Sequence, residues 1–334
     1  MKVVGFAAES VGADLKPWEY TLELSNPHEI LVEVEACGIC HSDIHMIDND
    51  WRMSTYPLVP GHEVVGRVVE LGSAVEGLVV GQRVGIGWQA SACMTCHDCL
   101  SGNENLCDHH QGLIVAGKGG FASHVKVDGR FAFPFPEALP VEAGPLLCGG
   151  VTVYSALRHA GMTSGQRIGV IGLGGLGHLA VLFASRLGNQ VTVFTTTAEK
   201  TRQAEQLGAA EVVVVEPGQS PPPPRARLDL LLCTVPYPQD WVAYLQWLGA
   251  DGTLVLVAGG PKPLEIPFWA LLGKRRRVMA SPIGGRAVLQ ETLELAARMK
   301  VLPQVEVFPL SEVNRALRQV RENAVRFRAV LRAG

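Results

Sequence analysis

The chain has 334 residues, of which 47% are hydrophobic and 18% charged, and its formal net charge is −3. This length exceeds what one hydrophobic core usually supports, so we expect two domains. The slight negative charge argues against a general affinity for nucleic acid.

The N-terminal residues, MKVVGFAAES, show no apolar segment followed by a small-residue cleavage site. We therefore expect no signal peptide and a cytoplasmic protein. The most membrane-like stretch, residues 168–184, is shorter than a typical span and holds five glycines and a histidine, so we expect no membrane association. In a reducing compartment, clustered cysteines are more often metal ligands or catalytic groups than disulfides.

The N-terminal region is predicted to be rich in β-strands. Residues 29–36 (EILVEVEA) alternate Ile30, Val32 and Val34 against Leu31, Glu33 and Glu35, which is the period of a strand.

Three short segments then carry scattered metal-binding side chains. Residues 35–45 (EACGICHSDIH), 59–72 (VPGHEVVGRVVELG) and 143–154 (AGPLLCGGVTVY) contain between them Cys37, Cys40, His41, His45, His62, Glu63 and Cys148. Catalytic zinc sites use about three protein ligands and keep one position open, and these ligands often come from separate parts of a chain. Each residue alone has an ordinary alternative, because a single cysteine is often a small buried hydrophobe.

Residues 93–107 (CMTCHDCLSGNENLC) have the spacing C-x2-C-x2-C-x7-C. A c-type haem would need only two of these cysteines, and a redox dithiol should begin a helix after a strand, whereas this segment is rich in turn residues. Four thiolates with short spacings favour a closed structural zinc site, with an iron–sulfur cluster as the alternative. A closed shell leaves no position for substrate. The predicted ligands are Cys93, Cys96, Cys99 and Cys107.

Residues 166–188 read as an apolar strand, a glycine turn and a helix that ends at Gly188. Gly172, Gly174 and Gly177 form G-x-G-x-x-G, in which the first glycine permits the turn, the second lets the backbone approach a pyrophosphate, and the third packs helix on strand. The predicted dinucleotide-binding residues here are Gly172, Gly174, Gly175, Leu176 and Gly177.

Alternating strands and helices follow this motif. Residues 190–195, 210–215, 228–235 and 252–259 are apolar runs typical of buried parallel strands, with helical stretches at 199–207 and 241–248 between them. This pattern predicts a doubly wound α/β domain. The basic run at 274–277 is interpreted as a solvated edge.

The residues that bear on the preference for NAD or NADP lie at the end of the second predicted strand of this domain and just after it. NAD-binding versions usually carry an acidic residue about 20 positions beyond the first glycine, but residues 191–198 contain none. Hydroxyl groups, a helix N-terminus and basic side chains suit the 2′-phosphate of NADP(H). Ordinary helix capping by the threonines is the alternative, and Glu199 is a mild counter-argument. The predicted contacts are Thr195, Thr196, Thr197 and Lys200, with Arg202 adding charge.

Together and in this order, CGICHSD, PGHEVVGRV, the four-cysteine segment, PLLCGG and the glycine motif resemble the zinc-containing medium-chain alcohol dehydrogenases. The resemblance runs through nearly the whole chain and is closest to the cinnamyl-alcohol-dehydrogenase-like branch, and within it to bacterial NADPH-dependent aldehyde reductases. It implies that Cys40, His62 and Cys148 bind the catalytic zinc. It also implies that Glu63 can enter the metal shell during exchange and that Asp43 orients His62.

The resemblance implies an α/β fold with a GroES-like β-barrel catalytic domain and a doubly wound Rossmann cofactor domain. We assign residues 1–150 and 284–334 to the catalytic zinc domain, with the structural zinc lobe at 93–107, and residues 151–283 to the dinucleotide domain. The expected cofactors are two Zn2+ per chain and NADP(H), and we expect a homodimer.

A route for the proton is predicted beside the catalytic metal. Ser42 can hydrogen-bond the substrate oxygen and His45 can pass its proton to solvent, because imidazole titrates near neutrality. The alternative is that Ser42 caps a helix and His45 is a surface residue. Relatives line their substrate pocket at the positions of Trp51, Met53 and Trp88, which suggests an apolar aldehyde.

The leading hypothesis is a zinc- and NADPH-dependent reductase of a broad range of apolar aliphatic and aromatic aldehydes, reversible as an alcohol dehydrogenase. Its alternatives are an NAD-preferring or cinnamyl-type alcohol dehydrogenase and, from another class, a zinc-ribbon binding protein with a relict nucleotide fold. A pure binding protein has no need of an open metal position, which argues against the last of these.

Overall fold

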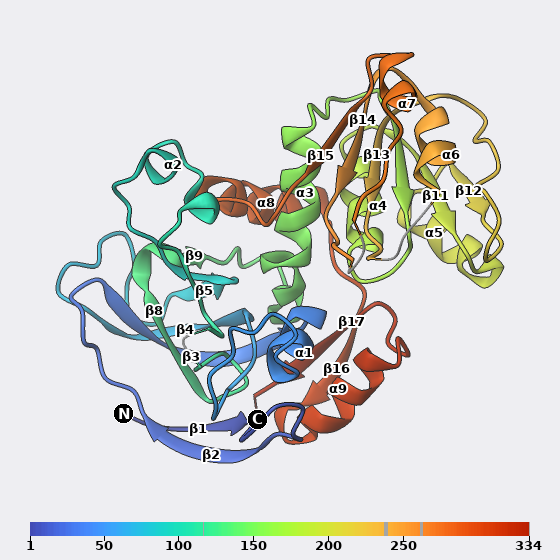
Figure 1. The fold of residues 1–334 in the computed structure, drawn as a ribbon. Helices are drawn as coiled ribbons and strands as arrows, with labels where there is room; N and C mark the ends of the chain where they lie inside the picture. The colour runs from blue at the N-terminus through green and yellow to red at the C-terminus, as the bar shows by residue number, and fades with distance from the viewer. Residues whose placement is uncertain (116, 237–239, 261–262, 334) are drawn as a thin grey trace. The chain divides into compact units, whose positions relative to one another are not determined.

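The computed structural model describes residues 1–115, 117–236, 240–260 and 263–333, and the chain forms two compact units (Figure 1). Unit 1 comprises Met1–Cys148, Gly285–Arg298 and Leu302–Gly334, and unit 2 comprises Gly149–Gly284 and Met299–Val301. The division of labour between a catalytic and a cofactor domain, with boundaries at 150/151 and 283/284, stays a prediction.

Unit 1 is rich in strands. Its strands are β1 (Lys2–Ala7), β2 (Lys16–Thr21), β3 (Glu29–Ile39), β4 (Glu63–Leu71), β5 (Arg83–Ile86), β6 (Gln89–Ser91), β7 (Gln111–Gly112), β8 (His124–Asp128), β9 (Ala132–Pro134), β16 (Val305–Pro309) and β17 (Arg328–Arg332). Its helices are α1 (His41–Ile47), α2 (His97–Leu100), α8 (Arg286–Met299) and α9 (Val313–Arg321), with 3-10 turns η1 (Glu104–Leu106), η2 (Gly129–Phe131), η3 (Val141–Leu147) and η5 (Leu310–Glu312).

Strand β3 pairs with three other strands, β17, β4 and β8, in the main sheet of unit 1. In the described residues it belongs to a seven-stranded sheet ordered β16-β17-β3-β4-β5-β9, in which β8 also pairs with β3. Figure 1 shows the red C-terminal strand β17 beside the blue β3, and the two are antiparallel neighbours. The predicted alternation holds for Ile30, Val32 and Val34, but Leu31 is also fully buried. Irregular register at Leu31/Val32 accompanies this departure from strict alternation.

Unit 2 alternates strands and helices along the chain. Its elements are α3 (Gly149–His159), β10 (Arg167–Ile171), α4 (Gly177–Arg186), β11 (Gln190–Thr195), η4 (Ala198–Lys200), α5 (Thr201–Leu207), β12 (Glu211–Val214), β13 (Leu228–Cys233), α6 (Trp241–Gln246), β14 (Leu248–Leu256), α7 (Phe268–Leu272) and β15 (Arg277–Ala280).

The unit 2 sheet confirms the doubly wound prediction. Its six strands in the described part of the chain are all parallel and ordered β12-β11-β10-β13-β14-β15. The chain therefore builds outward from β10 to one edge, then returns and builds to the other, so that the strand order reverses beside β10. Ligands of such sheets bind outside the carboxyl ends of the strands at this switch point, which is where the glycine motif lies.

The buried thiols and the apolar stretch at 168–184 have structural explanations. Cys37 and Cys233, which belong to neither set of predicted metal ligands, are 1% and 0% exposed. The apolar stretch is divided between strand β10 and helix α4. Among the described residues, every helix is too short or too polar to span a bilayer.

Candidate functional site

Helix α1 begins directly after Cys40 and carries the residues of the first metal-binding segment. Cys40 is the N-cap of this helix, so the alternative role of Ser42 as the cap does not hold. The Asp43 carboxylate lies in the first turn and accepts a hydrogen bond from the Cys40 backbone N–H at 2.8 Å. The start of the helix thus fixes the Cys40 side chain just beyond the C-terminal end of β3.

The same carboxylate reaches a second segment. Asp43 Oδ1 accepts hydrogen bonds from the Gly61 N–H and from His62 Nδ1, both at 2.9 Å, and Asp43 and His62 are fully buried. The hydrogen on Nδ1 leaves the lone pair of the imidazole on Nε2. This Nε2 atom is buried without a hydrogen-bond partner among the described residues. A buried, orphaned nitrogen of this kind fits a metal ligand whose other nitrogen is held by a carboxylate.

The three predicted segments converge in unit 1. One ligand atom from each of Cys40, His62, Glu63 and Cys148 lies within 4.8 Å of the others. The pKa of Cys40 is lowered well below its usual range because the Cys148 thiol donates to it, and sharing that proton raises the pKa of Cys148. Two sulfurs, one imidazole and a carboxylate are the donor set of a catalytic zinc site with an exchangeable position.

The structure adds a buried arginine that sequence reasoning missed. Arg328 on β17 forms an ion pair with the Glu63 carboxylate, and the two residues are 6% and 0% exposed. Burial lowers the pKa of Arg328, but Glu63 and the cluster of thiols more than reverse this and raise it. The partners are 265 positions apart, so only the pairing of β17 with β3 brings them together.

The predicted proton route lies along α1. Ser42 Oγ lies 3.7 Å from Cys40 Sγ, and His45, one helical turn further, is partly exposed. His45 Nδ1 is 2.7 Å from the carboxylate of Asp50, a partner that sequence reasoning did not include. These positions put a hydroxyl near the metal ligands and an imidazole nearer solvent; the relay itself stays a prediction.

Two of the three predicted pocket residues lie beside the metal cluster. The Trp88 ring packs edge-on against the His62 imidazole with centroids 5.2 Å apart, and Trp51 packs edge-on against Trp88 at 5.8 Å. The His45 ring follows at 5.2 Å from Trp51. Met53 is 43% exposed. The rings of Trp88 and Trp51 therefore connect the predicted metal ligand His62 to His45 through successive ring contacts.

The four cysteines of residues 93–107 gather into a second cluster. Their sulfurs lie within 4.8 Å of one another, with Cys93 Sγ 3.5 Å from Cys107 Sγ and 3.9 Å from Cys99 Sγ. Sulfurs about 2.3 Å from a tetrahedral ion lie about 3.8 Å apart, whereas a disulfide needs about 2.05 Å. All eight cysteines are free thiols. Backbone N–H groups of Thr95 and Cys96 lower the pKa of Cys93 to about 5, which favours the thiolate.

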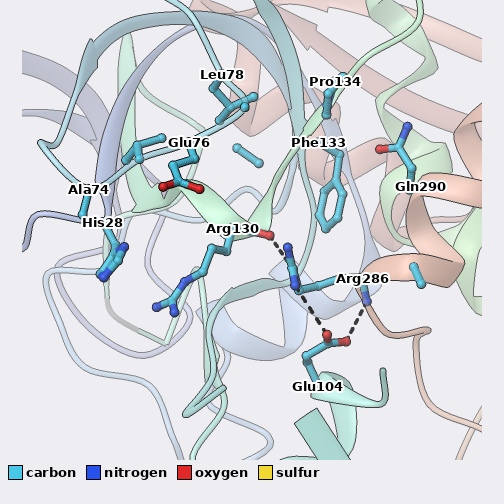
Figure 2. A pocket seen from close by; sticks show the side chains of 15 residues that line it. His28, Ala74, Glu76, Leu78, Glu104, Arg130, Phe133, Pro134, Arg286 and Gln290 are labelled. Carbon is cyan, nitrogen blue, oxygen red and sulfur yellow. Dashed lines mark hydrogen bonds and ion pairs between the residues drawn. The ribbon is translucent and has the colours of Figure 1, made fainter. Parts of the chain in front are cut away.

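A buried carboxylate joins this lobe to helix α8. Figure 2 shows Glu104 beside Arg286, whose backbone N–H donates to Glu104 Oε2 at 3.0 Å. They line a pocket of about 630 Å³, together with residues such as His28, Arg130 and Phe133. None of the predicted site residues is among the described residues that line it. This pocket is therefore separate from the predicted ligands of both metal clusters.

The three motif glycines in unit 2 have distinct surroundings. Gly172 has a positive φ of 92°, and a Cβ on Gly177 would lie 2.1 Å from the Gly172 carbonyl oxygen. A Cβ on Gly174 would meet no described atom within 4 Å, so its backbone faces open space. The surroundings match a turn, a close helix–strand contact and an approach for a ligand. Gly175 and Leu176 complete the turn, and Leu176 is the N-cap of α4.

The predicted 2′-phosphate contacts lie after β11. Thr195 is buried and its hydroxyl accepts from the Thr197 N–H at 3.3 Å, whereas Thr196 is exposed. The Lys200 ammonium donates to the Leu173 carbonyl in the glycine turn at 3.1 Å. The threonine segment and the glycine turn are therefore adjacent, as one cofactor would require.

Comparison with known proteins identifies the family. Residues 26–137 match the alcohol dehydrogenase GroES-like domain, and residues 175–298 match the zinc-binding dehydrogenase family. The chain is 38% identical over 330 residues to aldehyde reductase AdhA of Synechocystis, covering 98% of each sequence. The chain belongs to the zinc-containing medium-chain alcohol dehydrogenases.

Solved structures place it in the cinnamyl-alcohol-dehydrogenase-like branch of this family. A cinnamyl alcohol dehydrogenase from Sorghum bicolor superimposes with a TM-score of 0.91 at 35% identity, covering 99% of this chain and 98% of that one. The cinnamyl alcohol dehydrogenase of Helicobacter pylori complexed with NADP(H) gives a TM-score of 0.90 at 29% identity, with coverage of 99% and 98%.

Membership confirms the predicted fold class, a GroES-like domain with a Rossmann domain. This alcohol dehydrogenase is a zinc-dependent oxidoreductase of the alcohol dehydrogenase and aldehyde reductase type that uses a nicotinamide dinucleotide. The described part of the chain holds two candidate zinc sites, one of four cysteines and one of Cys40, His62, Glu63 and Cys148.

Proposed function

We propose that the protein reduces small, apolar aldehydes with NADPH and, in reverse, oxidises the corresponding alcohols. The convergence of Cys40, His62 and Cys148 carries this proposal, together with the buried His62 Nε2 atom, which has no hydrogen-bond partner in the described part of the chain. Bound zinc supplies a Lewis acid for a carbonyl oxygen, and NADPH supplies the hydride. The chain itself holds and orients the metal through Cys40, His62 and Cys148, with Glu63 beside them.

The protein side of the reaction follows from α1. Ser42 is proposed to hydrogen-bond the substrate oxygen, and His45 to carry the proton between this hydroxyl and solvent. The Asp50 carboxylate accepts a hydrogen bond from His45 Nδ1 at 2.7 Å, which supports a fixed ring orientation. Trp51 and Trp88 would exclude water and contact an apolar substrate, with Met53 as a further pocket residue.

The preference for NADPH is proposed from the segment after β11. Residues 191–198 carry no carboxylate, Thr196 is exposed, and the Lys200 side chain reaches the glycine turn. These features support the hydroxyl and the ammonium as donors to a 2′-phosphate. The H. pylori relative is described as complexed with NADP(H), which supports the same choice.

The deciding experiment is a screen of NADPH and NADH oxidation over aliphatic and aromatic aldehydes. We expect kcat/KM to be at least about tenfold higher with NADPH, because a 2′-phosphate contact is a charge-assisted interaction. Thr196→Asp should reduce kcat/KM with NADPH through charge repulsion and leave the NADH value unchanged or higher. Comparable kcat/KM for both cofactors in the unmodified protein would refute the NADPH preference.

Matched cysteine variants separate metal chemistry from packing. Cys148→Ser should abolish turnover and remove one zinc per chain, while Cys37→Ser, which changes a buried thiol outside the cluster, should retain both zinc ions. Turnover that survives in Cys148→Ser protein that retains only the zinc of the four-cysteine cluster would refute the zinc mechanism.

A homodimer is proposed through unit 2. β15 is an edge strand of the described sheet, and Phe268 and Trp269 on α7 are 64% and 74% exposed. Large exposed aromatics near an edge strand favour association with a second copy. Sedimentation should give a dimer, and Trp269→Glu should shift it toward monomer; an unmodified protein that sediments as a monomer contradicts this proposal.

A further inference from the structure

The buried ion pair beside the metal cluster is built from three neighbouring strands. Arg328 lies on β17, Gly38 on β3 and Glu63 on β4, and the strands are adjacent in that order. Gly38 is paired with Val330 on one side and with Glu63 on the other. The two charged side chains therefore meet across the central strand.

Gly38 supplies the space for this meeting. A Cβ at Gly38 would lie 2.0 Å from Glu63 Oε2 and 3.0 Å from Glu63 Cβ. The carboxylate thus lies directly over the glycine, with Oε1 paired to Arg328 and Oε2 without a hydrogen-bond partner among the described residues. Any larger residue at position 38 would displace the carboxylate.

The carboxylate has two competing positive neighbours once the metal is bound. A fully buried carboxylate is destabilised by its lost hydration unless a counter-charge compensates it. Arg328 provides one counter-charge, and a metal ion held by Cys40, His62 and Cys148 provides another, because a Glu63 oxygen lies within 4.8 Å of their ligand atoms. The ion pair therefore opposes movement of Glu63 onto the metal.

We propose that Arg328 and Gly38 hold the Glu63 carboxylate beside the metal, so that the fourth metal position stays open for the substrate oxygen. This inference rests on the proposed metal site and makes Arg328 a positioning residue. Without Arg328, the buried carboxylate would lose its partner, and a bound metal ion would be the remaining counter-charge within its reach. Without the space at Gly38, the carboxylate is pushed from its position.

Cobalt substitution tests this directly, without aldehyde or NADPH. Co2+ in place of zinc gives visible bands that respond when imidazole binds at an open position, and the closed four-thiolate site has no such position. Arg328→Met should weaken imidazole binding by about tenfold or more, in line with the usual effect of groups that orient metal ligands. Adding Glu63→Gln to that variant should restore the affinity to within about threefold of the unmodified protein, since an amide is a poor ligand for a metal.

Two further variants make the test robust. Gly38→Ala retains both charges and should weaken imidazole binding in the same direction, which covers the case that Arg328→Met does not fold. Arg332→Met is the matched control, because Arg332 is also an arginine of β17 paired with a carboxylate, that of Glu142, outside the metal cluster. It should leave the affinity unchanged.

Unchanged imidazole affinity in both Arg328→Met and Gly38→Ala would overturn the proposal. A loss of affinity that Glu63→Gln does not reverse would also overturn it, since Arg328 would then be merely structural. A cobalt spectrum of the unmodified protein that ignores imidazole would instead refute the open metal site itself, and this inference with it.

Discussion

At the scale of single residues, Asp43 organises the metal site. Its two carboxylate oxygens accept from the backbone of Cys40 and Gly61 and from His62 Nδ1, so one buried side chain fixes two proposed ligands. A carboxylate can accept all three hydrogen bonds, whereas an amide must present a donor at one of these positions. The negative charge also favours metal binding by raising the basicity of the imidazole.

We therefore expect Asp43→Asn to lower zinc affinity at the Cys40, His62 and Cys148 site by about 10- to 100-fold. Competition with a chromophoric chelator measures this. Asp50→Asn is the control, because Asp50 also pairs with a histidine, but its side chain is 53% exposed. Equal zinc affinity in Asp43→Asn and the unmodified protein would show that His62 is oriented by other means.

His45→Gln tests the proton route at the same scale. We expect kcat to fall by about tenfold or more, because general acid–base groups typically contribute 10²- to 10⁴-fold, and the pH dependence of kcat to change. Steady-state rates over a range of pH measure both effects, with His28→Gln as a control at a histidine outside the cluster. An unchanged rate and pH profile would remove His45 from the mechanism.

Among the secondary-structure elements, the turn between β10 and α4 contains one glycine that is needed for packing and one that leaves space for a ligand. Gly177 has the Gly172 carbonyl 2.1 Å from the position of a Cβ, whereas Gly174 faces open space. The two glycines are three residues apart in one motif, but of the two only Gly177 is constrained by neighbouring protein atoms. Alanine at each position therefore has different consequences.

Gly177→Ala should destabilise the fold by about 1–3 kcal/mol, the usual cost of overpacking, and weaken cofactor binding as a result. Gly174→Ala should leave the melting temperature unchanged and still weaken NADPH binding, because the new methyl group faces the space left for the pyrophosphate. Thermal unfolding and fluorescence titration with NADPH distinguish the two. Equal losses of stability in both variants would contradict this assignment.

The four-cysteine lobe is tied to another element by Glu104. This residue is 4% exposed, and its carboxylate accepts from the first backbone N–H of helix α8 and lies 3.6 Å from the Arg286 guanidinium. A negative charge at a helix N-terminus is favourable. The lobe thus contacts the start of α8, and this contact supports the predicted structural role of the closed metal site.

For the molecule as a whole, we expect the two metal clusters in unit 1 to have different roles. The four-thiolate cluster leaves no position for a substrate, whereas the Cys40, His62 and Cys148 cluster has one. We propose that bound metal stabilises the fold at the first cluster and takes part in the chemistry at the second.

Cys96→Ser should therefore reduce stability first. We expect a loss of about 2 kcal/mol or more and a melting temperature lower by roughly 4 °C or more, because the free energy of binding a structural metal is folding free energy. Protein that remains folded should keep its turnover and one zinc per chain. Loss of turnover in protein with an unchanged melting temperature would assign the lobe to the active site.

Local sequence patterns were sufficient for much of this protein. The cysteine spacing of residues 93–107 and the glycines at 172, 174 and 177 are short motifs whose geometry depends on contiguous residues. The strands at 190–195 and 228–235 were also predictable, because buried parallel strands are continuous apolar runs. The assignment of Cys40, His62 and Cys148 came from the order of several motifs and the resemblance they carry.

The motifs and their order along the chain were enough to identify the family, the two-domain class and the residue types available for metal and nucleotide. How these residues are held became visible only in the folded chain: the pairing of Arg328 with Glu63, the space at Gly38, the Asp50 partner of His45 and the burial of Leu31. The physical reason is that a motif records chemistry within one segment, whereas an ion pair between residues 265 positions apart depends on the register of three strands. That register is set by the whole sheet.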